Sequence, residues 1–194
     1  DARGHVTRFV YDELDRIVSV TDAKGQTTSY VYDTLGRLES VIDAAGEITS
    51  YTYDAVGNLL SKTDALGRVT AYEYDLLSRL KEEIDPLGQV TSLLYDSMGN
   101  VTSVTHPDHT TTSYGYDLVN RLPKITSHEG KPVRYAYDKL GRRTSMSDST
   151  GLTLYTYDAL SRLASVTDGR GQTIRYSWTP NGQRESMTYP DGSI

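Results

Sequence analysis

The chain has 194 residues and a formal net charge of −6, with 16 Tyr, one Phe, one Trp and no Cys. Its mean hydropathy is −0.51, and no apolar run approaches the roughly 20 residues that a membrane-spanning helix needs, so we expect no membrane span. The acidic charge argues against a nucleic-acid partner, and the lack of Cys excludes disulfide scaffolds and thiolate metal sites. The sequence has no initiating Met and no signal-peptide pattern, so we expect a segment of a longer protein.

The aromatic residues follow a repeat of 21 residues. The dipeptide Tyr-Asp recurs eight times from Tyr11 to Tyr157, with one step of 20 residues at the end, and Trp178-Thr179 fills a ninth position. A second column lies two residues before each of these, and 17 of the 18 positions in the two columns are aromatic. Only Tyr189 lies outside them. The Tyr content therefore indicates nine repeats rather than a catalytic cluster.

Each repeat holds two Asp-x-x-Gly tetrads, such as Asp33–Gly36 and Asp43–Gly46. Asp at the first position accepts a hydrogen bond from the backbone two residues on, and Gly at the fourth supplies a positive φ. Both tetrads therefore predict tight turns. The Gly position of the first tetrad is taken in four repeats by residues from which we expect the same left-handed conformation, namely Asp15, Ser78, Asn120 and Ser161.

The 6 to 8 residues between tetrads are rich in Thr, Tyr, Val and Ser and alternate in character, which is typical of β-strands. The sequence predicts an all-β fold, an antiparallel meander of β-hairpins that forms a single array over residues 1–194 with no separate domain boundary. Open twisted sheets rarely exceed about 10 strands without curling, so we expect a curled or spiralling ribbon that is part of a larger shell.

The spacing also predicts the strand register. A three-residue first loop sets Tyr32 opposite Leu38 and Tyr30 opposite Ser40. The Asp33–Arg37 pair is then expected on the face opposite to these Tyr side chains.

The odd period constrains the second turn of each repeat. If both loops of a repeat had an odd number of residues, the Tyr columns would move to the other face of the sheet in each successive repeat. We therefore expect the second turn to differ from the first, with an even loop or a bulge that sets Leu38 opposite Tyr53. The 20-residue repeat, which is shortened between Gly151 and Tyr155, should carry a compensating irregularity.

The run Tyr32-Asp-Thr-Leu-Gly-Arg-Leu38, continued by Gly46-x-x-Thr49-x-Tyr51-x-Tyr53-Asp54, resembles the YD repeat of bacterial Rhs proteins. Insecticidal toxin-complex shells share this repeat, and teneurins share it more distantly. The resemblance covers the whole chain and implies a β-ribbon that spirals into a hollow shell around a C-terminal toxin. It implies as partners the remainder of the shell and the enclosed toxin polypeptide, and a secreted or cell-surface location. Asp85-Pro86-Leu87-Gly88 is superficially similar to the family's self-cleavage motif, but it falls in an ordinary second turn, so no protease function follows.

The residues that we single out are structural positions of the repeat. Of the 18 Asp, eight follow the Tyr column and seven, Asp1 among them, open the second turn, which favours turn capping over acid–base catalysis. A lone Asp-x-x-Gly turn also offers too few oxygens for calcium. We predict no catalytic residue and no cofactor. The structural positions are Tyr30, Tyr32, Asp33, Gly36, Arg37, Leu38, Gly46, Tyr51, Tyr53, Tyr72 and Tyr74.

Three histidines are candidate metal ligands. His106 and His109 replace two positions of a second turn, and His128 lies in the next turn of that kind. Because these turns project from the same edge of the ribbon, the three imidazoles could meet and bind Zn²⁺ or Ni²⁺. The alternative is a solvated turn in which the repeat has drifted.

These observations favour a non-catalytic shell segment of an Rhs-type toxin. The first alternative is a cell-surface module that binds carbohydrate or protein, because rows of Tyr suit sugars and peptides. The second is a hydrolase with an unrecognised site. Bare strand edges at both ends of the array predict edge-to-edge self-association of the isolated segment.

Overall fold

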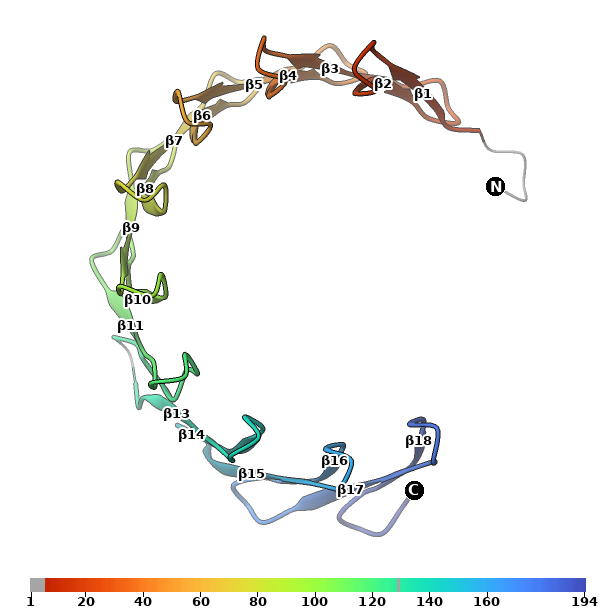
Figure 1. Ribbon diagram of the computed structural model, residues 1–194, viewed down its shortest axis with the longest axis vertical. Coiled ribbons are helices and arrows are strands. Elements are labelled where there is room, and N and C mark those ends of the chain that lie inside the picture. Colours follow the sequence, from red (N-terminus) through yellow and green to blue (C-terminus); the bar gives the residue numbers. More distant parts are fainter. Residues whose placement is uncertain (1–5, 129) are drawn as a thin grey trace. The chain divides into compact units, whose positions relative to one another are not determined.

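The computed structural model describes residues 6–128 and 130–194, and within these ranges it is all-β, with 18 strands, β1–β18 (Figure 1). Asp1, which we expected to open a turn, lies outside the described residues. The chain divides within β9 into two compact units, residues 1–92 and 93–194. Within each unit every strand pairs antiparallel with its neighbour in sequence, which confirms the predicted hairpin meander.

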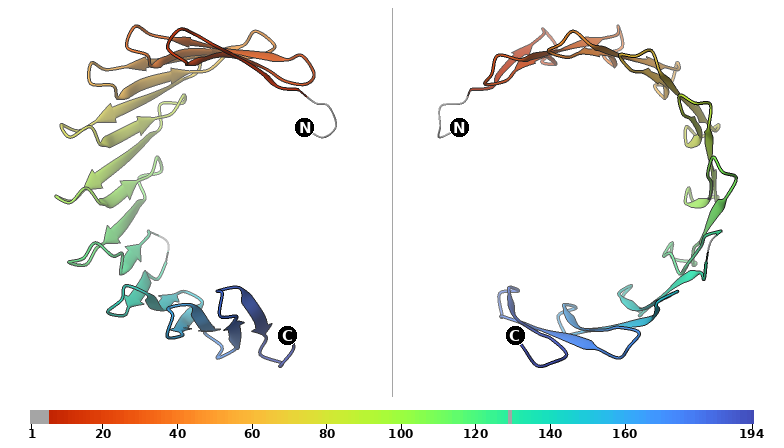
Figure 2. Two further views of the ribbon diagram at one scale, coloured as in Figure 1. Left: turned by 45° about the vertical axis from the view of Figure 1, so that its right-hand side comes forward. Right: turned by 180° about the vertical axis from the view of Figure 1, so that it is seen from behind.

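In the first unit the strands lie side by side in one layer, with turns projecting at both strand ends (Figure 2). Its strands are β1 (Arg8–Tyr11), β2 (Ile17–Thr21), β3 (Thr27–Tyr32), β4 (Leu38–Ile42), β5 (Ile48–Tyr53), β6 (Leu59–Thr63), β7 (Val69–Tyr74), β8 (Leu80–Ile84) and the first residues of β9 (Val90–Tyr95).

The second unit has the same single-layer construction. It contains the end of β9 and the strands β10 (Val101–Thr105), β11 (Thr111–Gly115), β12 (Lys124–Thr126), β13 (Val133–Tyr137), β14 (Arg143–Asp148), β15 (Gly151–Tyr157), β16 (Leu163–Thr167), β17 (Thr173–Trp178) and β18 (Arg184–Thr188).

Neither unit has a hydrophobic core. None of the described residues is buried, and the strand residues are half-buried or exposed. The usual source of fold stability, apolar side chains removed from water between two layers, is therefore missing from this part of the chain. Backbone ladders and contacts between neighbouring hairpins must hold each unit together.

Both tetrads form the predicted turns. In the first turn the N–H of Gly36 donates to the carbonyl oxygen of Asp33 at 2.9 Å, and in the second the N–H of Gly46 donates to that of Asp43 at 3.0 Å. Gly36 and Gly46 have φ of 80° and 83°. The residues that replace Gly also take positive φ as predicted, at Asp15, Ser78, Asn120 and Ser161, and His109 does the same in a second turn.

The register confirms one predicted pair and corrects another. Tyr32 lies opposite Leu38 as expected, but Tyr30 lies opposite Val41, and Ser40 lies opposite Val31. The cause is a β-bulge, because the register shifts by one residue between these pairs and leaves Glu39 without a partner.

This bulge also corrects the prediction for the second turn. The second turn closes with the same hydrogen bonds as the first, so the two turns do not differ. It sets Ile42 opposite Ile48 and Val41 opposite Thr49. An even loop that brings Leu38 opposite Tyr53 is therefore not formed. The odd period is compensated inside the first hairpin instead. Since Tyr30 and Thr49 both pair with Val41, the Tyr columns remain on one face as expected.

The 20-residue repeat does not carry the compensating irregularity that we expected, because the shortening lies within the turn and the register of β14 with β15 does not shift. Its second turn sets Asp148 opposite Gly151, so only two residues lie between the paired ends, and Met146 still pairs with Thr153. In other second turns the Asp lies opposite the residue that follows the Gly, as Asp43 lies opposite Glu47. In the short repeat this residue is missing, and Asp148 lies opposite the Gly itself. Tyr155 therefore keeps its face and pairs with Val166.

Candidate functional site

The first turns of the repeats form one edge in each unit, which we call the first-turn edge. Each of these turns is organised by its leading Asp. In Asp33, Oδ1 accepts hydrogen bonds from the backbone N–H of Leu35 and Arg37, both at 2.9 Å, and Oδ2 accepts one from Nε of Arg37 at 2.7 Å. The backbone N–H of Arg37 and then its side chain hold the pKa of Asp33 below the ordinary value, against the opposing effect of desolvation. The Asp thus caps the turn and fixes the direction of the Arg.

The Arg side chain of the first turn reaches into the next repeat. The guanidinium of Arg37 lies 4.8 Å from the ring centroid of Tyr53, and Nη1 donates to the backbone carbonyl oxygen of Asp54 at 2.7 Å. Arg121 makes the same two contacts with Tyr137 and Asp138, at 5.1 Å and 3.1 Å. Cation–π contacts of this kind contribute about 0.5–2 kcal/mol, depending on desolvation. Each Arg therefore connects two consecutive hairpins.

The tyrosines of the second column reach back to the previous repeat. Oη of Tyr53 donates to the backbone carbonyl oxygen of Leu38 at 2.9 Å, and Tyr32 makes the same contact with Ile17 at 2.8 Å. Nε1 of Trp178 replaces the phenol and donates to Leu163 at 2.8 Å, which explains why an indole is accepted in this column. Arg and Tyr together form a reciprocal link between repeats, which we call the inter-repeat clamp.

The clamp corrects the predicted faces. We expected the Asp33–Arg37 pair on the face opposite to the Tyr columns, but Arg37 lies over the ring of Tyr53. The Arg follows Gly36, which has positive φ, and its long side chain crosses from one hairpin to the next rather than pointing away from the aromatic face. The sequence signal that was missed is the regular spacing between each Arg and the aromatic residue that it covers, which is 16 residues except in the short repeat, where Arg142 and Tyr157 are 15 apart.

The second turns lack this link. Arg68 is the Arg of a second turn and pairs with Asp64 through Nε at 2.6 Å, but its side chain is 62% exposed, against 26% for Arg37. Elsewhere the corresponding position varies and holds neutral, acidic or basic residues, such as Gln26, Glu47 and Lys131. The two edges of each unit therefore differ, although their turns close in the same way.

The first-turn edge also carries a row of exposed apolar side chains. The residue before the Gly position is Leu, Val or Met in eight first turns, each 68–78% exposed: Leu14, Leu35, Val56, Leu77, Met98, Val119, Leu140 and Leu160. The equivalent position of the second turns holds Lys24, Asp108 or Arg170 in some repeats, so the turn geometry does not require an apolar residue there. Such a row of exposed apolar groups is typical of a surface that contacts another polypeptide.

The predicted metal site is not formed. The described residues contain no group of three His, Cys, Asp or Glu side chains that could hold a metal ion, so His106, His109 and His128 do not converge. The reason is local: His109 occupies the Gly position of its turn with φ of 64°, and the imidazole of His106 lies 3.4 Å from Oγ1 of Thr112.

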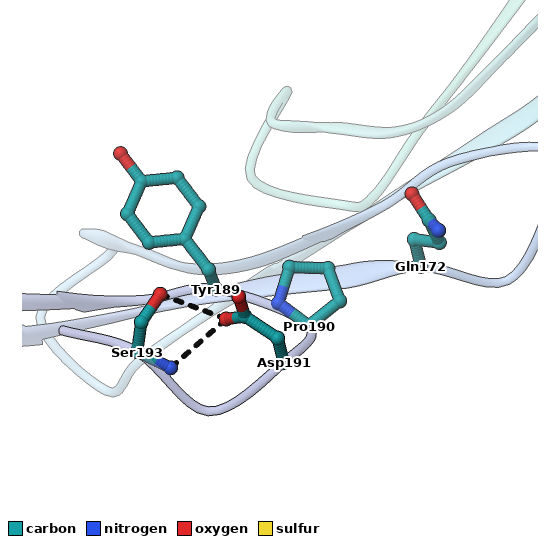
Figure 3. Close-up of a pocket in the computed structure, with 5 residues that line it drawn as sticks. All are labelled: Gln172, Tyr189, Pro190, Asp191 and Ser193. Atoms are coloured by element: carbon teal, nitrogen blue, oxygen red, sulfur yellow. Dashed lines mark hydrogen bonds between the residues drawn. The ribbon is translucent and has the colours of Figure 1, made fainter.

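Tyr189, the aromatic residue outside the columns, lines a hollow of about 620 Å³ with Gln172, Pro190, Asp191 and Ser193 (Figure 3). It stands at the first position of a second turn, where most other repeats have Asp. Both N–H and Oγ of Ser193 donate to Oδ1 of Asp191, at 2.9 and 2.7 Å. Ser193 therefore stabilises the turn, because both of its donors are engaged by Asp191.

Two family models match the chain. A teneurin YD-shell model matches residues 1–154, and an RHS repeat model matches residues 157–194. No curated protein sequence matches the chain. Within the described residues no helix is long and apolar enough to cross a bilayer.

Solved structures share the fold. A crystal structure of TcdB2-TccC3-Cdc42 is 20% identical with a TM-score of 0.71, and the match covers 95% of this chain and 12% of that chain. A TcdB2-TccC3 structure without the hypervariable C-terminal region is 18% identical with a TM-score of 0.64, covering 97% and 15%. The Tc holotoxin pore of Photorhabdus luminescens is 17% identical with a TM-score of 0.63, covering 96% and 15%.

The chain thus spans between 12% and 15% of the length of these three structures. At such identities the likeness shows the fold alone. The family follows from the YD-shell model, which covers well over half of the residues, and it confirms the resemblance that the Tyr-Asp repeats indicated. The chain is a segment of YD-repeat shell and belongs to the teneurin YD-shell family.

Proposed function

We propose that the chain is part of the wall of an Rhs-type shell that encloses a toxin polypeptide and protects it before delivery. The observation that carries this proposal is the single-layer sheet without any buried residue among those described. A protein that acts as an independent globular domain buries one face of its sheet against a second layer. A wall has a different task, since its two faces separate an interior from an exterior.

The position of the specific side-chain contacts supports a structural role. Along the first-turn edge, Asp, Arg and Tyr are engaged in turn closure and in the inter-repeat clamp. Where the clamp is complete, these groups link one hairpin to the next. We infer that the segment is not an enzyme and that its work is to extend a regular sheet.

The proposed partners are the remainder of the shell and the enclosed polypeptide. The exposed apolar row of the first-turn edge is suited to contacts with further shell segments, which would cover side chains such as Leu35 and Leu77. Secretion or display at the cell surface follows as part of the same proposal, because a toxin shell acts outside the producing cell.

Limited proteolysis of the longer protein that contains this segment tests the proposal. We expect an internal polypeptide that resists a protease in the intact protein and becomes susceptible when mild denaturant opens the shell. Equal susceptibility before and after opening would overturn the proposal. Specific glycan binding that Tyr30→Ala or Tyr51→Ala abolishes without loss of fold would instead support the binding module.

A further inference from the structure

The inter-repeat clamp lacks its guanidinium at two places. In most repeats the aromatic ring of the second column lies beneath an Arg of the preceding repeat, at 4.5 to 5.8 Å for Tyr32, Tyr53, Tyr137, Tyr157 and Trp178. At Tyr74 and Tyr116 the residue in the Arg position is Asn58 and Asn100, respectively. The amide is too short to cover the ring. Instead Nδ2 of Asn58 donates to Oδ2 of Asp54 at 2.8 Å and to Oγ of Ser78 at 3.2 Å.

A hollow lies at each of these two places. In the first unit a hollow of about 420 Å³ is lined by Asp54, Asn58, Tyr74 and Asp75, together with the exposed apolar residues Val56 and Leu76. In the second unit a separate hollow of about 550 Å³ is lined by Asp96, Tyr116, Asp117, Met98 and Leu118, which are equivalent to Asp54, Tyr74, Asp75, Val56 and Leu76. The two hollows therefore share one construction.

The groups that receive a guanidinium elsewhere are present in the first hollow. The backbone carbonyl oxygen of Asp75 is equivalent to that of Asp54, which accepts Nη1 of Arg37. Its one hydrogen bond among the described residues comes from the N–H of Ser78 within the turn, at 3.0 Å, so a second lone pair is open. The Tyr74 ring supplies the aromatic face. The carboxylate of Asp54, whose side-chain partner is the neutral Asn58 rather than an Arg, supplies negative charge.

Titration behaviour agrees with an uncompensated negative charge at this place. Desolvation and then the carboxylate of Asp54 raise the pKa of Tyr74. Desolvation also raises the pKa of Tyr53, but there the positive charge of Arg37 acts in the opposite direction. The pKa of both tyrosines is raised, and a guanidinium opposes the shift only at Tyr53.

We propose that each hollow binds an arginine side chain of a partner polypeptide, whose guanidinium takes the place that the chain's own Arg occupies in the other repeats. The planar guanidinium would stack on Tyr74 or Tyr116 and donate to the carbonyl oxygen of Asp75 or Asp117. The methylene groups of the ligand would lie along Val56 and Leu76 in the first hollow. The proposal stands apart from the shell function, since it concerns only the chemistry of these two repeats.

Arginine fits these hollows better than lysine. Lysine is a compact point charge, whereas the hollow offers a flat ring beside a carbonyl oxygen and a carboxylate, and these groups match a planar fork of donors. The other repeats give the same answer, because the equivalent position holds Arg at residues 16, 37, 79, 121, 142 and 162 and holds Lys in none of them.

The test uses NMR of the full chain with labelled Tyr rings, titrated with N-acetyl-arginine methylamide. We expect saturable shifts of the Tyr74 and Tyr116 ring signals and none at Tyr53, whose face Arg37 covers. N-acetyl-citrulline methylamide, which is nearly isosteric and neutral, should give no saturable shift. Equal responses to both ligands, or an equal response at Tyr53, would overturn the proposal.

Two variants make the test specific to the sites. Asn58→Arg should weaken binding at Tyr74 at least tenfold and leave Tyr116 unchanged, and Asn100→Arg should do the reverse, so each variant controls for the other. Asn58→Ala, which leaves the hollow open, should keep binding at Tyr74. Retained binding at Tyr74 in folded Asn58→Arg contradicts the proposal. If that variant does not fold, the citrulline comparison and Asn100→Arg decide it.

Discussion

The guanidinium of Arg37 lies 4.8 Å from the ring centroid of Tyr53, an aromatic residue that belongs to the next repeat. The same side chain donates to the backbone of Asp54 and pairs with Asp33, so it joins the turn of one hairpin to the turn of the next. In a sheet whose described residues include none that is buried, such links take over part of the role of a core. Stability should therefore depend on contacts between neighbouring repeats, as in other repeat proteins.

The first prediction concerns the clamp Arg. Arg37→Ala should lower the free energy of unfolding by about 1–2 kcal/mol, because it removes a cation–π contact and a charged hydrogen bond to backbone. Arg68→Ala is the matched control, since Arg68 has the same pairing with Asp64 and a mostly exposed side chain. An exposed pair of this kind contributes about 0–1 kcal/mol. Urea denaturation of both variants measures the difference, and equal losses would show that the clamp adds nothing.

The second prediction separates the two Tyr columns. Tyr53→Phe removes the hydroxyl that donates to Leu38 and should cost about 0.5–1.5 kcal/mol. Tyr51 belongs to the first column, and within the described residues its hydroxyl makes no hydrogen bond, so Tyr51→Phe should leave the stability nearly unchanged. Thermal unfolding followed by circular dichroism compares the two. A larger loss for Tyr51→Phe would contradict the assigned roles.

The third prediction concerns pH. Hydrogen bonds to Asp33 from the backbone and side chain of Arg37 lower its folded pKa below the ordinary value of 3.8. A lowered carboxyl pKa stabilises the fold fully above the unfolded pKa, and this contribution is lost as the pH falls through the folded pKa. Several other turn Asp residues are shifted in the same direction, among them Asp12, Asp75 and Asp117. The chain should therefore lose stability steeply below about pH 4.

Asp33→Asn provides the check on this titration. The variant should be less stable than the wild type at pH 7, and the gap should narrow as the pH approaches 2. Urea midpoints measured from pH 7 to pH 2 give both curves. A constant gap across that range would mean that the charge of Asp33 does not contribute.

The fourth prediction concerns the short repeat. A Cβ added at Gly169 would lie 3.1 Å from Cα of Gly151 and 3.1 Å from the carbonyl oxygen of Thr150, so backbone would have to move. Gly169→Ala should cost about 1–3 kcal/mol. At Gly115 the nearest atom is Cβ of Lys124 at 3.8 Å, so Gly115→Ala should be neutral or slightly stabilising. Chemical denaturation distinguishes them, and equal effects would argue against the close approach of the two turns.

Much of the fold could be predicted because turn chemistry and alternation recur in every repeat. The Asp-x-x-Gly turns and the pair of Tyr32 with Leu38 depend only on local sequence. The bulge at Glu39 could not be located, since parity requires one irregularity per repeat but does not say in which hairpin it lies. Pro123 takes the position of Glu39 in a later repeat. Because Pro has no N–H to donate within a sheet, it is found at bulges, and this residue could have indicated where the bulge lies.

The candidate site was harder to predict than the fold. The pairing of Asp33 with Arg37 follows from a short loop, but the contact of Arg37 with Tyr53 spans two turns and depends on the direction of a long side chain. The hollows at Asn58 and Asn100 become visible only once the role of the Arg position is known. The histidine hypothesis considered the edge that the turns share and not the conformation that His109 adopts as a replacement for Gly.

Electron microscopy of the longer protein that contains this segment tests the central claim most directly. The shell account predicts a closed cage whose wall is one sheet thick, with these repeats in the wall and polypeptide density inside. An open or filamentous array of the same repeats, or a closed cage without internal density, would contradict it.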